Sequence, residues 1–130
     1  MRHVVARAAE IPPGGRLIVA LEGRSIGVFN VGGELFALRN ACPHQGGPLC
    51  EGVLSGLAAA ERPGEYRYER HGEILRCPWH GWEFDVRTGR SHVDPARTRV
   101  RSYPVELAHG PYVAETYQAS VEEDLVLVDL

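Results

Sequence analysis

Lysine is absent from the chain, and arginine supplies all fourteen basic side chains. We attribute this bias to codon usage and give it no functional weight. An overall excess of positive charge is lacking too, because seventeen acidic residues leave a formal net charge of -3. Binding to a nucleic-acid backbone usually requires clustered basic side chains. The composition therefore argues against a nucleic-acid partner and favours a protein partner that meets a mildly acidic docking surface.

Long hydrophobic runs are also absent. The longest strongly apolar stretch covers residues 17–21, far short of the ~20 residues that a membrane-spanning helix needs. The N-terminal segment lacks the apolar run of about 7 to 15 residues that characterises a secretory signal. We therefore expect no membrane anchor and no export, and we take the cytoplasm as the default compartment.

Cysteine is scarce and odd in number, since only Cys42, Cys50 and Cys77 occur. Without an export signal, such thiols are more often metal ligands or buried apolar groups than disulfide partners. A chain of 130 residues, 44% hydrophobic and 24% charged, has the size and composition of one globular domain. We expect one domain over residues 1–130, with no room for a second, catalytic domain.

The fifteen glycines and nine prolines separate short runs rich in Val, Leu, Ile, Tyr and Phe, which is typical of an all-β protein with frequent turns. A glycine pair at residues 31–34 and a single glycine at residues 70–73 predict two hairpin turns. Residues 55–60 predict at most a turn or two of helix. The expected strands cover residues 4–8, 16–21, 25–31, 34–40, 65–70, 73–76, 82–85, 99–107, 112–115 and 125–130.

Two segments rich in Pro and Gly carry the candidate chemistry, at about residues 41–50 and 77–85. The first contains Cys42-Pro43-His44, and the second contains Cys77-Pro78-Trp79-His80-Gly81. Each segment follows an expected strand and offers one thiolate and one imidazole, which are metal ligands. Thirty-two residues, 45–76, separate the two pairs.

The order of these ligands distinguishes between two metal sites. A structural zinc site usually groups Cys with Cys and His with His along the chain, whereas here they are mixed. A 2Fe-2S centre with two Cys on one iron and two His on the other requires each loop to reach both irons. The mixed order suits that geometry, although a zinc site with the same side chains stays open as an alternative.

These two boxes resemble those of the Rieske 2Fe-2S proteins, which run Cys-x-His and Cys-x-x-His-Gly. The resemblance continues through residues 84–90 and 103–105 and covers roughly residues 16–130. It implies a Rieske-like antiparallel β-sandwich or barrel with a cluster-binding subdomain at one tip. It also implies that a 2Fe-2S cluster is held by Cys42, His44, Cys77 and His80, with the two His near solvent and the two Cys on the buried iron.

Within this family the chain is most similar to small stand-alone bacterial proteins, either ferredoxin components of ring-hydroxylating dioxygenases or small subunits of nitrite reductases. The spacing between the boxes is longer than expected for a dioxygenase ferredoxin, and residues 55–68 resemble an inserted, surface-exposed hairpin. Respiratory Rieske proteins carry an extra disulfide between the boxes. Here Trp79 stands where one of those cysteines would be, and Cys50 has no matching partner.

Two further positions bear on the reduction potential. Respiratory members place a Ser and a Tyr after the second His, and their hydroxyls donate hydrogen bonds that raise the potential. The corresponding positions here are Trp82 and Phe84, which have no hydroxyl. We therefore expect a potential near the low end of the Rieske range, about -150 mV.

The other residues of these types have simpler interpretations. Cys50 is expected to be a small buried hydrophobe, and Trp79 and Trp82 are expected to be buried aromatics that keep water from the sulfurs. His3, His71 and His109 lack the spacing of a second metal site, whereas the resemblance allows His92 to pack near the cluster. The acidic residues 122–124 are expected to form a solvated turn.

The resemblance implies an electron-transfer protein without a substrate site of its own. It would carry single electrons from a flavin-dependent or other reductase to a terminal oxygenase or reductase subunit. The alternative is an accessory subunit of a nitrite reductase-like complex. A complete oxygenase needs a mononuclear iron site of two His and one carboxylate on a separate fold, which this length excludes, and a zinc-bound interaction module would have no redox role.

Overall fold

The computed structural model describes residues 2–43, 46–59, 67–79, 81–91, 94–108, 112–113, 120–121 and 124–130. Strands dominate these ranges, in agreement with the expected all-β fold, and the two helical elements are single 3-10 turns, η1 (Ala8–Glu10) and η2 (Leu49–Glu51). The strands are β1 (Arg2–Arg7), β2 (Arg16–Leu21), β3 (Arg24–Val31), β4 (Glu34–Arg39), β5 (Val53–Ala59), β6 (Arg67–Arg76), β7 (Glu83–Asp85), β8 (Ser102–Tyr103), β9 (Val105–Ala108), β10 (Tyr112–Val113), β11 (Ser120–Val121) and β12 (Leu125–Asp129).

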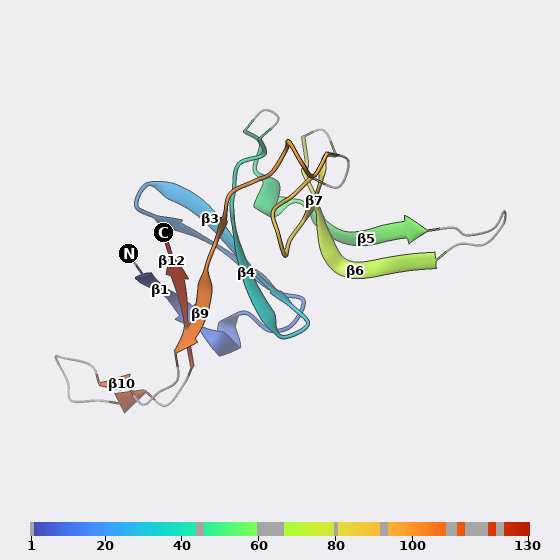
Figure 1. The fold of residues 1–130 in the computed structure, drawn as a ribbon. Helices are drawn as coiled ribbons and strands as arrows, with labels where there is room; N and C mark the ends of the chain where they lie inside the picture. The colour runs from blue at the N-terminus through green and yellow to red at the C-terminus, as the bar shows by residue number, and fades with distance from the viewer. Residues whose placement is uncertain are drawn as a thin grey trace.

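The strands form antiparallel sheets that occupy different parts of the molecule (Figure 1). The largest sheet has the order β2-β3-β4-β8, and a second has the order β1-β12-β9. The sheet β5-β6-β7 lies at the other end of the molecule, and β10 pairs with β11 in a small separate ribbon. Strand β11 was not among the expected strands.

Strand β3 explains why the middle of the molecule is a sandwich. Ile26 and Val28 on one face belong to an apolar cluster shared with Val126 and Val128 of β12. Phe29, on the opposite face of β3, belongs to a second apolar cluster that reaches the β5-β6-β7 end. Because side chains alternate across a strand, a sheet buried on both faces requires a continuous apolar run here.

The turn between β3 and β4 confirms the hairpin predicted at residues 31–34. Val31 pairs with Glu34 across the turn. Gly32 and Gly33 have φ of 60° and 98°, respectively. Positive φ at both central positions matches the right-handed twist of the flanking strands, so the glycine pair fixes the register of this hairpin.

One expected strand, over residues 99–107, is divided in the structure. Tyr103 pairs with β4, whereas Val105 pairs with β12 of another sheet. Pro104 lies between them, and proline cannot donate a backbone hydrogen bond to a ladder. The chain therefore changes sheets at Pro104 and forms β8 and β9 instead of one strand.

The expectations for residues 55–60 and 70–73 were wrong. Residues 53–59 form strand β5 instead of a helical turn, and β6 runs without reversal through residues 70–73. Ser55 of β5 pairs with Ile74 of β6, and the next pair joins Leu57 to Glu69, so the register shifts between these two pairs. The extra residues of β6 form a bulge that contains Gly72 at φ 79°, and β6 bends sharply there (Figure 1).

Strands β5 and β6 pair antiparallel as the hairpin expected over residues 55–68, and they extend away from the other sheets (Figure 1). The residues that join the two strands, and the acidic residues 122 and 123, lie outside the described ranges. Within the described ranges, no helix has the length and apolar character that crossing a bilayer would require.

Candidate metal centre

Two loops bring the sequence motifs to the same end of the molecule, beside β7 (Figure 1). We call residues 42–47, which follow β4, the first loop. Residues 77–82, which join β6 to β7, are the second loop. Cys77 directly follows the end of β6, whereas Cys42 comes three residues after the end of β4.

The two loops share one backbone frame. The N–H of Cys42 donates to the carbonyl of Gly47 at 2.8 Å, and its carbonyl accepts from the N–H of Gly46 at 2.7 Å. In the second loop the N–H of Cys77 donates to the carbonyl of Trp82 at 2.8 Å, and its carbonyl accepts from the N–H of Gly81 at 2.9 Å. Each cysteine is thus fixed by the same pair of hydrogen bonds.

Glycine at the fifth position of each loop is required by this frame. Gly46 has φ of 75° and Gly81 has φ of 73°. This left-handed conformation is accessible to glycine without steric cost and strained for most other residues. Two different stretches of sequence therefore form the same tight turn, which begins at a cysteine and includes the glycine four residues later.

The two thiols lie in one apolar environment. Cys42 and Cys77 are each only 3% exposed and belong to the same buried cluster as Phe84, Leu49 and Leu75. All three cysteines are among the described residues, and none forms a disulfide. Two buried cysteines at the ends of equivalent loops can both act as thiolate ligands from the interior of the protein.

The histidines of the motifs, His44 and His80, lie outside the described residues, as does His92. The structure therefore describes two of the four expected ligands, and within its described ranges no group of three or more metal-ligating side chains is brought together. The ligand set Cys42, His44, Cys77 and His80 remains a prediction from the motif.

The expectation that both tryptophans are buried was wrong for Trp79, which is 55% exposed. Its indole nevertheless lies directly over the first loop, because a Cβ placed on Gly47 would be 2.8 Å from Cδ2 of the ring. Trp82 is partly buried and packs against the cluster that contains the two cysteines. The exposed ring of Trp79 therefore connects the two loops, and Trp82 covers part of the apolar cluster of residues around the two cysteines.

The first loop is anchored by residues that the sequence motifs did not indicate. The side-chain oxygen of Asn40 accepts from the N–H of Cys50 at 2.8 Å. The guanidinium of Arg16 donates to the carbonyl of Cys50 at 2.9 Å and to that of Gly52 at 2.5 Å. Both side chains satisfy backbone groups of η2, the turn that follows the first loop. A polar residue in an apolar strand is the only sequence signal that could have suggested Arg16.

Cys50 has the role expected of a small buried hydrophobe, which confirms that prediction. It is fully buried, and its Sγ lies 3.6 Å from the carbonyl of Leu38. Its Cβ and Sγ fill the space beside Gly27, where a Cβ would approach both atoms within 2.6 Å. Burial raises the pKa of the Cys50 thiol to about 12, so this cysteine stays neutral and unreactive.

Among the other histidines, only His3 has a described side chain. Its Nε2 lies 3.4 Å from a carboxylate oxygen of Glu22. His3 belongs to strand β1, which lies far from the two loops (Figure 1). His109 lies outside the described residues, as does the side chain of His71. His3 therefore takes no part in the candidate metal centre.

The sequence also matches known proteins. The family model of the Rieske [2Fe-2S] domain matches residues 1–104. The ferredoxin component of the naphthalene 1,2-dioxygenase system from Pseudomonas aeruginosa is 32% identical over 98 residues, which are 75% of this chain and 79% of that protein. The biphenyl dioxygenase ferredoxin subunit from Pseudomonas sp. strain KKS102 is 30% identical over 98 residues, with 75% and 76% coverage.

Solved structures agree with this match over nearly the whole chain. The ferredoxin from Sphingomonas yanoikuyae B1 is similar with a TM-score of 0.66 at 25% identity, covering 100% of this chain and 99% of that one. The ferredoxin of carbazole 1,9a-dioxygenase from Nocardioides aromaticivorans IC177 has a TM-score of 0.62 at 26% identity, with 97% and 96% coverage. The two loops with buried cysteines, the all-β fold and these matches agree, and the chain belongs to the Rieske [2Fe-2S] domain family, whose cofactor is a Rieske-type 2Fe-2S cluster.

Proposed function

We propose that this chain is a single-domain electron carrier of a dioxygenase system. It would receive one electron from a reductase and deliver it to a terminal oxygenase, without a substrate site of its own. The proposal rests on one observation above all, the burial of Cys42 and Cys77 in equivalent loops of one apolar cluster. The similar proteins are ferredoxin components or subunits by name, which supports the same role.

The ligands in this proposal are Cys42, His44, Cys77 and His80. The 2Fe-2S cluster that they would hold supplies reversible one-electron chemistry. The chain's own contribution is to fix each cysteine through two backbone hydrogen bonds. Phe84 and Leu75, both fully buried beside the cysteines, exclude water from the sulfur side of the site. Exclusion of water and the scarcity of hydrogen-bond donors both influence the potential.

The residues after the second His support a low potential. Phe84 is fully buried in the cluster of residues that contains both cysteines, and Trp82 packs against it. Neither side chain has a hydroxyl that could donate a hydrogen bond to a sulfur. We propose a midpoint near the low end of the Rieske range, about -150 mV. A redox titration that placed the midpoint above roughly +100 mV would contradict the proposal.

The acceptor in this proposal is a terminal oxygenase. A solved complex of reduced oxygenase and oxidised ferredoxin in carbazole 1,9a-dioxygenase contains a similar fold, with a TM-score of 0.64 at 25% identity and coverage of 96% of this chain and 91% of that one. The donor is proposed to be a flavin-dependent or other reductase. The absence of disulfides among the three cysteines supports a reducing compartment, the cytoplasm.

Electron paramagnetic resonance and visible absorption, before and after reduction with dithionite, test the proposal. A rhombic signal with a low average g value after reduction is expected, because two His ligands on one iron distinguish this cluster from an all-Cys cluster. The Cys50→Ala variant serves as the control and should retain the signal, since Cys50 is a buried packing residue whose Sγ fills the space beside Gly27. A colourless, silent protein with bound zinc would make the chain a structural module.

A further inference from the structure

Charge is distributed unevenly along the chain. Residues 86–104 contain five of the fourteen arginines and a single acidic residue, Asp94. The rest of the chain contains nine arginines and sixteen acidic residues. A locally basic segment is therefore embedded in a protein of net negative charge.

Four of these arginines have no counter-charge among the residues that the structure describes. Arg87 forms ion pairs with Glu34 at 3.2 Å and Glu73 at 2.6 Å. The others are exposed, and none of them forms an ion pair with any residue that the structure describes. We call these four the arginine patch: Arg90, Arg97, Arg99 and Arg101.

Two residues of the arginine patch, Arg97 and Arg99, border both loops of the candidate metal centre. Arg97 and Arg99 line a surface hollow of about 380 Å³ together with Pro43 and Trp82. Pro43 follows Cys42 in the first loop, and the carbonyl of Trp82 accepts the hydrogen bond from Cys77. The positive charge thus lies next to the place where electrons would enter or leave.

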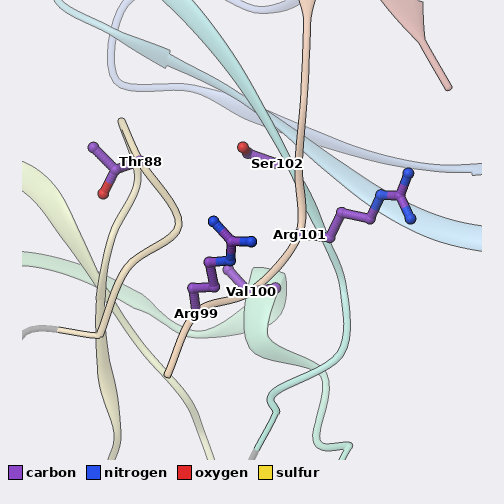
Figure 2. A pocket seen from close by; sticks show the side chains of 5 residues that line it. All are labelled: Thr88, Arg99, Val100, Arg101 and Ser102. Carbon is purple, nitrogen blue, oxygen red and sulfur yellow. The ribbon is translucent and has the colours of Figure 1, made fainter. Parts of the chain in front are cut away.

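A second hollow, of about 410 Å³, shares Arg99 with the first. Figure 2 shows Arg99 extending in the direction of Thr88 and Ser102, which supply hydroxyl groups. Arg101 also lines this hollow, and in Figure 2 its side chain points away from that of Arg99. Guanidinium groups and hydroxyls together can donate several hydrogen bonds to a carboxylate.

The backbone that carries the arginine patch is fixed in place. The N–H of Ser91 donates to the carbonyl of Thr98 at 2.9 Å, and that of Val100 donates to Gly89 at 2.7 Å. Arg39 on β4 donates its N–H to the carbonyl of Arg101 at 2.9 Å. A fixed backbone reduces the entropy lost when a partner binds, which suits a docking surface better than a mobile basic loop does.

We propose that the arginine patch is the docking surface for a redox partner that presents carboxylates around its own electron-transfer site. This inference rests on the proposed function. It reverses the expectation from net charge, because the surface beside the cluster loops is basic although the protein as a whole is acidic. Arginine binds carboxylates through a planar, bidentate fork, and charge complementarity accelerates encounter and fixes orientation.

Small oxidants of opposite charge test the local sign of the surface. Stopped-flow mixing would follow the oxidation of reduced protein by ferricyanide, an anion, and by hexaamminecobalt(III), a cation. In each case one electron leaves the protein and reduces the metal of the oxidant from the trivalent to the divalent state. Rising ionic strength should slow the ferricyanide reaction at least about tenfold and accelerate the hexaamminecobalt(III) reaction.

Two matched double variants identify the source of this charge. In the Arg97→Glu/Arg99→Glu variant the salt dependence should change sign with both oxidants. The Arg2→Glu/Arg7→Glu variant changes the net charge by the same amount on β1, at the other end of the molecule (Figure 1), and should behave like the unmodified protein. Equal effects of the two variants, or a salt dependence that follows the net charge of -3, would overturn the proposal.

A short oligoglutamate peptide tests the recognition of carboxylates independently of electron transfer. Titration calorimetry should detect salt-sensitive binding to the unmodified protein and to the β1 variant, with loss of binding in the Arg97→Glu/Arg99→Glu variant. A lack of binding to the unmodified protein would overturn the docking surface even if the protein is redox-active. Binding by a protein without a Rieske signal would support the surface while contradicting the proposed function.

Discussion

The first and second loops have the same backbone hydrogen bonds, but different segments of the chain hold the two loops in place. In both, a cysteine is held by hydrogen bonds to the residues four and five positions further along the chain. The second loop simply joins β6 to β7. The first loop leads into the buried turn η2, which Arg16 and Asn40 fasten to the large sheet. The site therefore depends on two separate structural units, and each can be disturbed alone.

The comparison also explains the spacing of the motifs. Cys-x-His and Cys-x-x-His suggest loops of different length, yet Gly46 and Gly81 both follow their cysteine by four residues and have nearly the same φ. The loops are equal in length, and in the sequence the two His follow their cysteines by different numbers of residues. Trp79 takes the position in the second loop that His44 takes in the first.

The largest expected effect is the loss of either buried thiol. Cys42→Ala and Cys77→Ala should each abolish cluster binding, because each removes one of the two proposed thiolate ligands from the same apolar site. Iron analysis and the dithionite-reduced resonance signal would measure the loss. Cys50→Ala should keep both iron and signal. If only one of the two ligand variants lost its iron, the loops would not be equivalent.

Gly52→Ala should have the next largest effect, since Gly52, directly after η2, packs against the end of β6 that leads into the second loop. A Cβ at Gly52 would lie 1.8 Å from the carbonyl oxygen of Arg76, the residue before Cys77. Relief of this overlap requires movement of the backbone and should cost at least about 3 kcal/mol. Denaturant titration followed by circular dichroism would measure the change in stability, and iron content would report on the site.

Gly32→Asn provides the control for Gly52→Ala. Gly32 lies in the β3-β4 turn, where no atom is within 4 Å of an added Cβ, and Asn tolerates positive φ better than most residues. This variant should lose much less stability and keep its iron. Gly52 itself has φ of -74°, a region that alanine adopts without strain, so equal losses in the two variants would show that the overlap with Arg76 adds little to the cost.

The sequence motifs could indicate the two loops because the requirements of each loop are local. A cysteine and a glycine with positive φ specify the frame of each loop within six residues, and Gly32 and Gly33 specify the β3-β4 turn in the same way. Strand β2 was predicted with both of its ends correct. The family matches agree with the cofactor inferred from the motifs.

Features that depend on contacts distant in sequence were missed. The alanines of β5 favour helix by propensity, and pairing with β6 overrides this preference. The hydrogen bonds from Arg16 to residues more than thirty positions away have no local signature. Net charge likewise concealed the arginine patch, because charges from the whole chain are summed without regard to position.

The pH dependence of stability should report on the support of the first loop. Burial raises the pKa of Cys50 from 9.0 to about 12, so the folded state favours the neutral thiol. Stability from this group is complete below pH ~9 and declines as the pH rises towards 12, with a loss of about 1 kcal/mol per pH unit over this range. Denaturation at several pH values would measure the slope, and Cys50→Ala should remove this part of it.

The smallest expected effect concerns the contact between the two loops. An alanine at Gly47 would place Cβ 2.8 Å from the ring of Trp79. Because this ring is 55% exposed, it can move outward, and Gly47→Ala should cost only about 1 kcal/mol, the lower end of overpacking. In a double-mutant cycle, Trp79→Ala should cancel most of that cost. Independent, additive losses would mean that Trp79 does not link the loops, and that each loop is held by its own support alone.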